Sequence, residues 1–179
     1  STHYTINPTT DFEESTSYYI QIDSNAFQDI EGELFQGIND KTTLSFKTAD
    51  ETAPSAPSSL TTTSTITSDT SPTITGSAEA DSTVKLYSGS TLLGSATSDS
   101  NGAFFVTSSN LSEGSYSLTA TATDAAGNTS YASSVLSITV DETAPTISSF
   151  TPSDDATAVA TNNNIVLSFS EAVDYGTGN

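Results

Sequence analysis

The sequence predicts an all-β protein built from antiparallel sandwich modules, and three observations support this fold class. Apolar and polar residues alternate through most of the 179-residue chain, which is the pattern of half-buried strands. Turn-forming residues interrupt these runs at intervals of about 8–12 residues, a spacing typical of sandwiches and barrels. No segment shows a convincing apolar period of a helix, and residues 155–164 could form a helical turn at most.

The expected strands follow one another along the chain, separated by short segments rich in Gly, Asn and Ser. The alternating runs are residues 17–23, 42–48, 72–78, 83–89, 103–109, 115–123, 135–140 and 164–172. The turn segments between the runs of the middle part are residues 88–90, 101–102, 113–114 and 127–128. We therefore expect about seven strands in the middle of the chain, about three before them and about two after them.

The pentapeptide DETAP occurs twice, at residues 50–54 and 141–145, and it divides the chain into three parts. Residues 51–142 are long enough for one complete sandwich, whereas residues 1–50 and 143–179 are too short to bury a core alone. The sequence thus predicts one complete module and one module split into two partial flanks.

The composition limits the partners of the chain. It has 22 acidic and 3 basic side chains, no Arg and a net charge of −19. This balance argues against binding to nucleic acid or to anionic lipid, both of which require Lys and Arg. It suits a cationic partner, although an acidic surface also simply keeps a protein soluble. There is no Cys, no apolar run of membrane-spanning length and no visible signal peptide, so we expect the export and anchoring signals to lie outside this fragment.

The middle part carries several motifs in a fixed order. They are SDSNGAFFV at 98–106, LSEGSYSLTATATDAAGNTS at 111–130 and VLSITVDETAP at 135–145. Together they resemble the tandem Ig-like repeats of giant bacterial surface adhesins. The resemblance implies an Ig-like antiparallel β-sandwich on the bacterial cell surface, outside the cell, acting as an extender between other modules.

The flanks resemble two pieces of a related Ig-like module found in S-layer proteins and adhesins. Residues 143–173 are similar to the beginning of that module and residues 18–50 to its end. Two interpretations stay open. The chain is cut from an array in mid-module, or the flanks pair with each other, within one chain or between neighbours, and rebuild a split module. The expected partners are therefore neighbouring Ig-like modules and the half modules of other chains.

Acidic residues of the middle part are predicted to gather at one pole. In an up-and-down strand order, the loops at 77–82, 98–102 and 123–128 lie at the same end as the first DETAP. The side chains brought together there are Asp50, Glu51, Glu79, Asp81, Asp99, Asp124 and Asn128. Carboxylates this close repel each other, and Ca²⁺, which takes six to eight oxygens, would relieve the repulsion. The resemblance also implies Ca²⁺ at module joints.

A simpler interpretation exists for the single loops. Asp99 begins an Asp-Ser-Asn-Gly sequence and Asp124 an Asp-Ala-Ala-Gly sequence, and both are good tight turns without any metal. The second joint is predicted to repeat the first, with Asp141 and Glu142 meeting Asp29 and Glu31 when the flanks assemble. The acids at residues 11–14 are expected to form a solvated loop.

The favoured function is a structural spacer stiffened by Ca²⁺ at its joints. A glycan- or ice-binding module is the alternative, because the Thr-rich run at 61–68 could present a flat hydroxyl face. An enzyme, such as a glycosidase with two carboxylates, is disfavoured because the chain lacks Arg and Trp and has a single His near its start.

Overall fold

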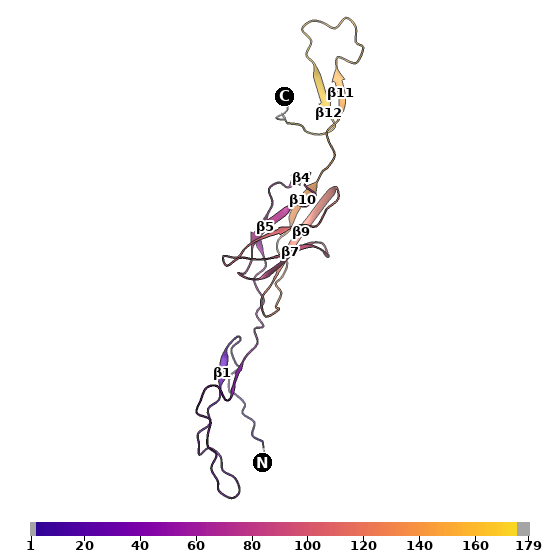
Figure 1. Cartoon of the computed structure of the whole chain (residues 1–179). Helices are drawn as coiled ribbons and strands as arrows, with labels where there is room; N and C mark the ends of the chain where they lie inside the picture. The colour runs from indigo at the N-terminus through magenta and orange to yellow at the C-terminus, as the bar shows by residue number, and fades with distance from the viewer. Residues whose placement is uncertain (1–2, 175–179) are drawn as a thin grey trace.

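The computed structural model describes residues 3–174, which form three parts in a row along one long axis (Figure 1). We call them the N-terminal lobe (residues 3–50), the middle domain (residues 51–142) and the C-terminal hairpin (residues 143–174). Within residues 3–174 the regular elements are all strands, which confirms the predicted all-β class. Accordingly, no helix in this range could cross a membrane.

The middle domain is a sandwich of two sheets. One sheet has the order β4-β10-β9-β6-β7, and the other has the order β3-β5-β8. The first contains β4 (Ile66–Thr67), β10 (Leu136–Val140), β9 (Gly114–Thr123), β6 (Thr83–Ser88) and β7 (Thr91–Thr97). The second contains β3 (Ser58–Thr61), β5 (Thr73–Ser77) and β8 (Ala103–Thr107). Neighbouring strands are antiparallel, except that β4 runs parallel to β10.

The core lies between these two sheets and uses the alternating positions of the sequence. Ile74, Phe104 and Val106 come from the smaller sheet, and Leu118 and Ile138 come from the larger one, all at most 2% exposed. The ring of Phe104 fills the space beside Gly76, where an added Cβ would approach within 2.6 Å of the ring. The alternating apolar side chains are therefore buried wherever a second sheet covers the first.

The N-terminal lobe is a strand pair with long connections. β1 (Ser17–Tyr19) and β2 (Ser45–Lys47) are antiparallel, with Tyr18 opposite Phe46. The pairing continues irregularly through an isolated bridge between Ile22 and Ile38. About three strands were expected here, and the described lobe has two strands and isolated bridges.

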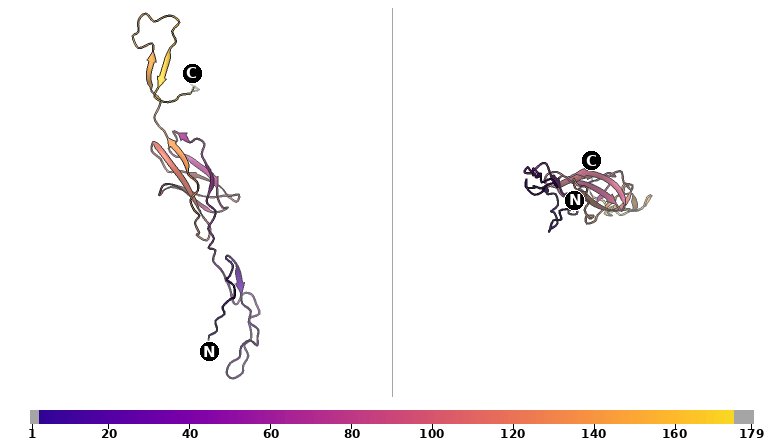
Figure 2. Two further views of the ribbon diagram at one scale, coloured as in Figure 1. Left: turned by 180° about the vertical axis from the view of Figure 1, so that it is seen from behind. Right: turned by 90° about the horizontal axis from the view of Figure 1, so that it is seen from below.

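The C-terminal hairpin consists of β11 (Ile147–Thr151) and β12 (Val166–Phe169), joined by a loop without regular structure. Every residue of both strands is exposed. The hairpin and the N-terminal lobe lie at opposite ends of the middle domain in both lateral views (Figures 1 and 2). Strands β1 and β2 pair only with each other, as do β11 and β12, so this structure does not join the flanks within one chain. Residues 1–2 and 175–179 of the predicted flanks lie outside the described residues.

Candidate functional site

The two DETAP segments are joints with the same local geometry. In the first, the backbone N–H of Thr52 donates to Asp50 Oδ1 at 3.1 Å. In the second, the backbone N–H of Thr143 donates to Asp141 Oδ1, also at 3.1 Å. An Asp side chain that accepts from the backbone two residues later is a common turn device. It sets the backbone turn at each Thr.

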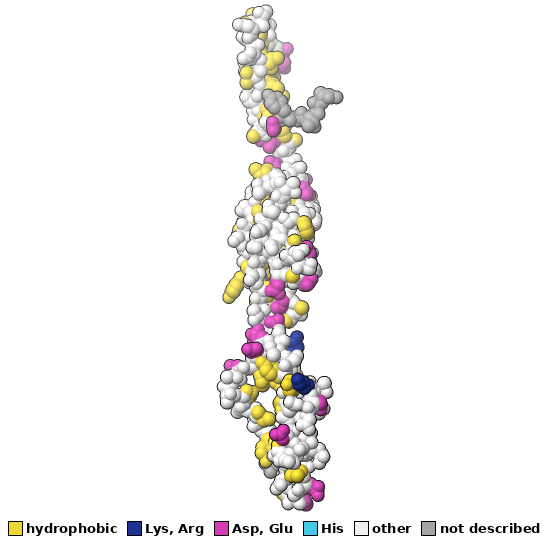
Figure 3. All heavy atoms as spheres, turned by 90° about the vertical axis from the view of Figure 1, so that its left-hand side faces the viewer, with side chains coloured by type: hydrophobic (Ala, Val, Ile, Leu, Met, Phe, Trp, Pro, Cys, Tyr) yellow, Lys and Arg dark blue, Asp and Glu magenta, His cyan; other side chains and the backbone are white. Residues whose placement is uncertain are grey.

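Each Thr hydroxyl reaches back to a glutamate of the preceding part. Thr52 Oγ1 donates to Glu14 Oε2 at 2.6 Å, and Thr143 Oγ1 donates to Glu113 Oε2 at 2.8 Å. Hydrogen bonds to a charged carboxylate are stronger than neutral ones. Acidic side chains line both joints in the space-filling view (Figure 3).

The two glutamates occupy corresponding places in the fold. Glu14 comes shortly before β1, whose partner β2 leads into the first DETAP. Glu113 directly precedes β9, whose partner β10 leads into the second DETAP. Glu14 lies in an exposed loop, as predicted for residues 11–14, but its contact with the joint was not foreseen, and Glu113 was expected only as part of a turn segment. The register of strands far apart in sequence creates both contacts.

The first joint is also bonded to the domain that follows it. Asn128 Nδ2 donates to the backbone carbonyl of Asp50 at 3.0 Å and to Asp124 Oδ2 at 2.9 Å. Asp124 Oδ1 accepts the backbone N–H groups of Ala126, Gly127 and Asn128 at 2.7–2.9 Å. The Asn128 amide, helped by these N–H groups, holds the pKa of the Asp124 carboxyl below its usual range, although desolvation opposes the shift. Asp124 therefore orients the side chain that contacts the joint.

The turn at Asp124 recurs at Asp29 and Asp99. In each turn the Gly three residues after the Asp has a positive φ, which is +92° at Gly32, +83° at Gly102 and +98° at Gly127. The N–H of that Gly donates to the carbonyl of the Asp in all three turns. Asp29 Oδ1 and Asp99 Oδ1 each accept two backbone N–H groups. The carboxylates thus have the turn-forming role that the simpler interpretation gave to Asp99 and Asp124.

The predicted calcium ligands of the first joint share a pole but are only partly brought together. Thr83 lies between Thr97 and Thr123 in the sheet, so the three acidic loops emerge at one end. Glu79 lines a small cavity with Ser55 and Ala56, just after DETAP. Asn128 connects Asp124 to Asp50. However, residues 3–174 contain no group of three or more His, Asp or Glu side chains arranged to hold a metal ion.

The neighbours of the second joint within one chain differ from those predicted for assembled flanks. Asp141 and Glu142 were expected to meet Asp29 and Glu31 only when the flanks assemble, and in this structure residues 29 and 31 belong to the N-terminal lobe at the other end of the chain (Figure 1). Instead, Glu113, Asp141, Thr143 and Glu171 line a cavity of about 390 Å³ between the middle domain and the C-terminal hairpin.

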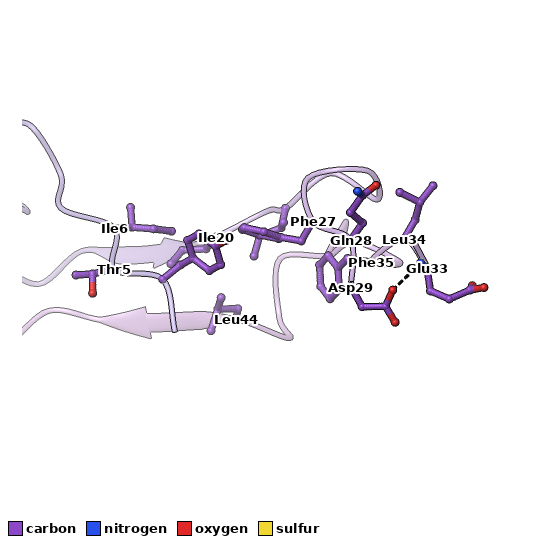
Figure 4. A pocket seen from close by; sticks show the side chains of 12 residues that line it. Thr5, Ile6, Ile20, Phe27, Gln28, Asp29, Glu33, Leu34, Phe35 and Leu44 are labelled. Carbon is purple, nitrogen blue, oxygen red and sulfur yellow. Dashed lines mark hydrogen bonds between the residues drawn. The ribbon is translucent and has the colours of Figure 1, made fainter. Parts of the chain in front are cut away.

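A larger apolar cavity of about 870 Å³ lies in the N-terminal lobe (Figure 4). Its walls include Ile6, Ile20, Phe27, Leu34 and Leu44, with Asp29 and Glu33 at one side. Sequence patterns do not predict this cavity directly, because it depends on the absence of a second sheet over β1 and β2 in the described lobe.

These features define one β-sandwich module with a two-stranded partial module on either side, connected by hydrogen-bonded joints. The chain belongs to the bacterial Ig-like domain family, as the resemblance predicted. A family profile described as "Bacterial Ig-like domain" matches residues 43–142, and a second profile of that description matches residues 141–179.

Two solved structures are similar to parts of the chain. One is titled "Biofilm associated protein - BSP domain", with 21% identity, a TM-score of 0.40 and coverage of 71% of this chain and 19% of that one. The other is titled "Structure of Protease", with 15% identity, a TM-score of 0.31 and coverage of 60% and 22%. The chain therefore spans about a fifth of the length of either protein. No curated protein matches the chain.

Proposed function

We propose that this chain is a structural spacer of a long bacterial surface adhesin, located outside the cell, in which the DETAP joints hold successive Ig-like modules end to end. The observation that supports it most is the repeated contact between a DETAP Thr hydroxyl and a glutamate of the preceding part. The row of parts along one axis in Figure 1 agrees with a spacer. The proposal assigns no catalytic role to the chain.

The mechanism is mechanical. Each Thr–Glu bond restrains rotation about the joint from the preceding side, and Pro54 and Pro145 restrict the backbone φ. The first joint has two further restraints, because Asn128 bonds the carbonyl of Asp50 and Pro54 is buried, whereas Pro145 is exposed. The first joint should therefore be the stiffer of the two.

Ca²⁺ is the second part of the proposal. Four acidic residues either lie in the first joint or are connected to it by hydrogen bonds: Glu14, Asp50, Glu51 and Asp124. Their mutual repulsion favours a cation with many oxygen ligands. Asp124 Oδ1 is already used by three backbone N–H groups, so the ion would rely on the other carboxylate oxygens and on backbone carbonyls. Glu51, within the joint, and Glu79, which lines the neighbouring cavity with Ser55 and Ala56, would complete the ligand set.

The two parts can be tested separately. Melting and the distance across the first joint are measured in Ca²⁺ and in chelator, for the wild type and for Glu14→Gln with Glu51→Gln. The proposal predicts a lower melting temperature and a broader distance distribution in chelator, with little response in the double variant. If chelator changes neither property of the wild type, the metal part is wrong. The hydrogen-bonded joint is then tested alone by Thr52→Val.

The structure disfavours the alternative of a flat glycan- or ice-binding face. Residues 61–68 do not form one strand, because Thr61 ends β3 in one sheet and Ile66–Thr67 form β4 in the other. Their hydroxyl groups therefore do not share the single flat surface on which that alternative depended.

A further inference from the structure

We propose that the middle domain carries tension along its strands, and that the pairing of β4 with β10 is the clamp that resists this tension. The inference rests on the proposed spacer function, because a spacer attached at one end and bound at the other is stretched between its ends. It concerns only the complete module, so it depends neither on the two partial modules nor on Ca²⁺.

Tension would enter and leave the middle domain at opposite poles. The first DETAP lies beside the loop that follows β9, since Asn128 in that loop bonds the carbonyl of Asp50. The second DETAP leaves from the other end of the same strand, because Val140 is opposite Gly114, the first residue of β9. A pull on the two joints therefore acts along the strands of the domain (Figure 1).

Strand β4 connects the segment after the first joint to the last strand of the domain. β4 runs parallel to β10, with Ile66 opposite Thr139. The N–H of Thr139 donates to the carbonyl of Thr65 at 2.7 Å, and the N–H of Asp141 donates to the carbonyl of Thr67 at 2.9 Å. The pull reaches β4 through its first residue and β10 through its last, so the two strands would have to slide past each other. Bonds that lie across the pull are then loaded together, and the pair resists more force than one whose bonds open in turn.

The Thr-rich run strengthens this attachment because it passes between the sheets. β3 pairs with β5 in the smaller sheet, and β4 pairs with β10 in the larger one. The segment from β3 to β4 is thus fixed to both sheets before the chain turns into β5. The pairing of β3 with β5 is irregular between Ser58 and Thr61. Load that β3 releases passes to β4, so the β4–β10 pair sets the force at which the domain unfolds.

The backbone of β4 provides a matched pair of variants. The carbonyls of Thr65 and Thr67 both face β10, so the backbone groups of Ile66 face away from it. Thr67→Pro removes an N–H on the side of β10. Ile66→Pro removes an N–H on the outer side, where an edge strand tolerates Pro. Urea titration of both variants measures how far each substitution changes stability in the absence of force.

The test stretches single molecules of the 179-residue chain between two attachment points. The chain has no Cys, so attachment at Ser55→Cys and Glu142→Cys pulls along the strands from opposite poles. Attachment at Ser68→Cys and Glu142→Cys pulls β4 and β10 apart from the same end, because Ser68 follows β4 and the two strands are parallel. In this second direction the same bonds open one after another.

The unaltered domain should unfold at a clearly higher force in the first direction than in the second. In the first direction, Thr67→Pro should unfold about tenfold faster at a constant force, because it loses bonding between β4 and β10. Ile66→Pro should unfold like the unaltered domain.

Equal unfolding forces in the two directions would overturn the proposal, and so would a Thr67→Pro protein that resists force as well as Ile66→Pro. If Thr67→Pro does not fold, the comparison of the two directions decides alone. The spacer proposal is tested separately, by the distance across the first joint. A failed clamp with an intact narrow distance distribution would therefore reject this inference and leave the spacer function in place.

Discussion

The middle domain and the N-terminal lobe contain the same kind of strand pair before a DETAP joint, but only the pair in the middle domain is covered by a second sheet. Leu118 and Ile138 on β9 and β10 are at most 2% exposed, whereas Leu44 and Phe46 in the lobe are each 40% exposed. The alternation of apolar residues specifies a strand and its face in both places. Burial depends on whether a second sheet is present, so the same pattern forms a core in one part and an open surface in the other.

The largest expected effect on stability comes from replacing a buried aromatic residue of the middle domain by Ala, compared with the same change in the N-terminal lobe. Phe104→Ala removes a ring that is 1% exposed from the middle core. It should lower the free energy of unfolding by about 3–5 kcal/mol in urea titrations. Phe46→Ala, at a ring that is 40% exposed, should cost about 1 kcal/mol. Similar losses at the two positions would show that the lobe is covered in solution.

Two glycines of the Asp turns provide the next test. An added Cβ at Gly102 would lie 2.3 Å from the carbonyl oxygen of Ala78, whereas at Gly127 it would meet nothing within 4 Å. Both have a positive φ, so Gly127→Ala should cost only the backbone strain of about 1 kcal/mol. Gly102→Ala adds a backbone clash and should cost more than about 2 kcal/mol. Equal changes in chemical unfolding would contradict the close packing of the loop around residue 102.

Acid should weaken the turn beside the first joint. The folded state lowers the pKa of Asp124 below its ordinary value of 3.8, so its stabilising contribution is complete above that value. The contribution is lost as the pH falls through the lower folded-state pKa. The melting temperature of Asp124→Asn should therefore lie below that of the wild type at pH 5, and the difference should shrink below about pH 4. A difference independent of pH would mean that the charge of Asp124 has no role.

The N-terminal lobe has a carboxylate of the same kind. The hydroxyl groups of Thr43 and Thr42, with the backbone N–H groups of both residues, hold the pKa of Asp40 far below its usual range. Asp40→Asn should not change the melting of the middle domain, because Asp40 belongs to a different part. It therefore serves as the matched control for Asp124→Asn.

The smallest expected effect on stability is at the joints, where the bonds are exposed. Thr52→Val and Thr143→Val each remove one bond to a glutamate, which should cost less than about 1 kcal/mol. Their effect on flexibility should differ, because Asn128 also bonds the first joint. The distance distribution between spin labels should broaden more for Thr143→Val across the second joint than for Thr52→Val across the first. The reverse order would contradict the proposed role of Asn128.

The all-β class and its strands could be predicted because they depend on local alternation and turn residues. The Asp turns could also be predicted, because the residues that form each turn, such as Asp99 and Gly102, are only three positions apart in the sequence. Glu14 and Glu113 could not be found in this way, because their contacts with Thr52 and Thr143 arise from strand pairing. The course of the Thr-rich run, the basis of the alternative function, could not be predicted for a related reason, because it passes from one sheet to the other between β3 and β4.

The calcium set shows the limit of predicting a site from the position of loops. The loops share a pole as expected, yet a carboxylate can bind either a cation or nearby N–H groups. At Asp29, Asp99 and Asp124 one carboxylate oxygen accepts two or three backbone N–H groups within its own turn. Loop placement alone does not decide between these uses.

The central claim is that a DETAP joint fixes the modules on either side of it. The chain has no Cys, so spin labels can be placed at Ser45→Cys in β2 and Ser95→Cys in β7 without background labelling. Double electron–electron resonance across the first joint should give one narrow distance distribution. The combination of Thr52→Val and Asn128→Ala should broaden it. A broad distribution that is the same in the unaltered joint and in this variant would contradict the claim.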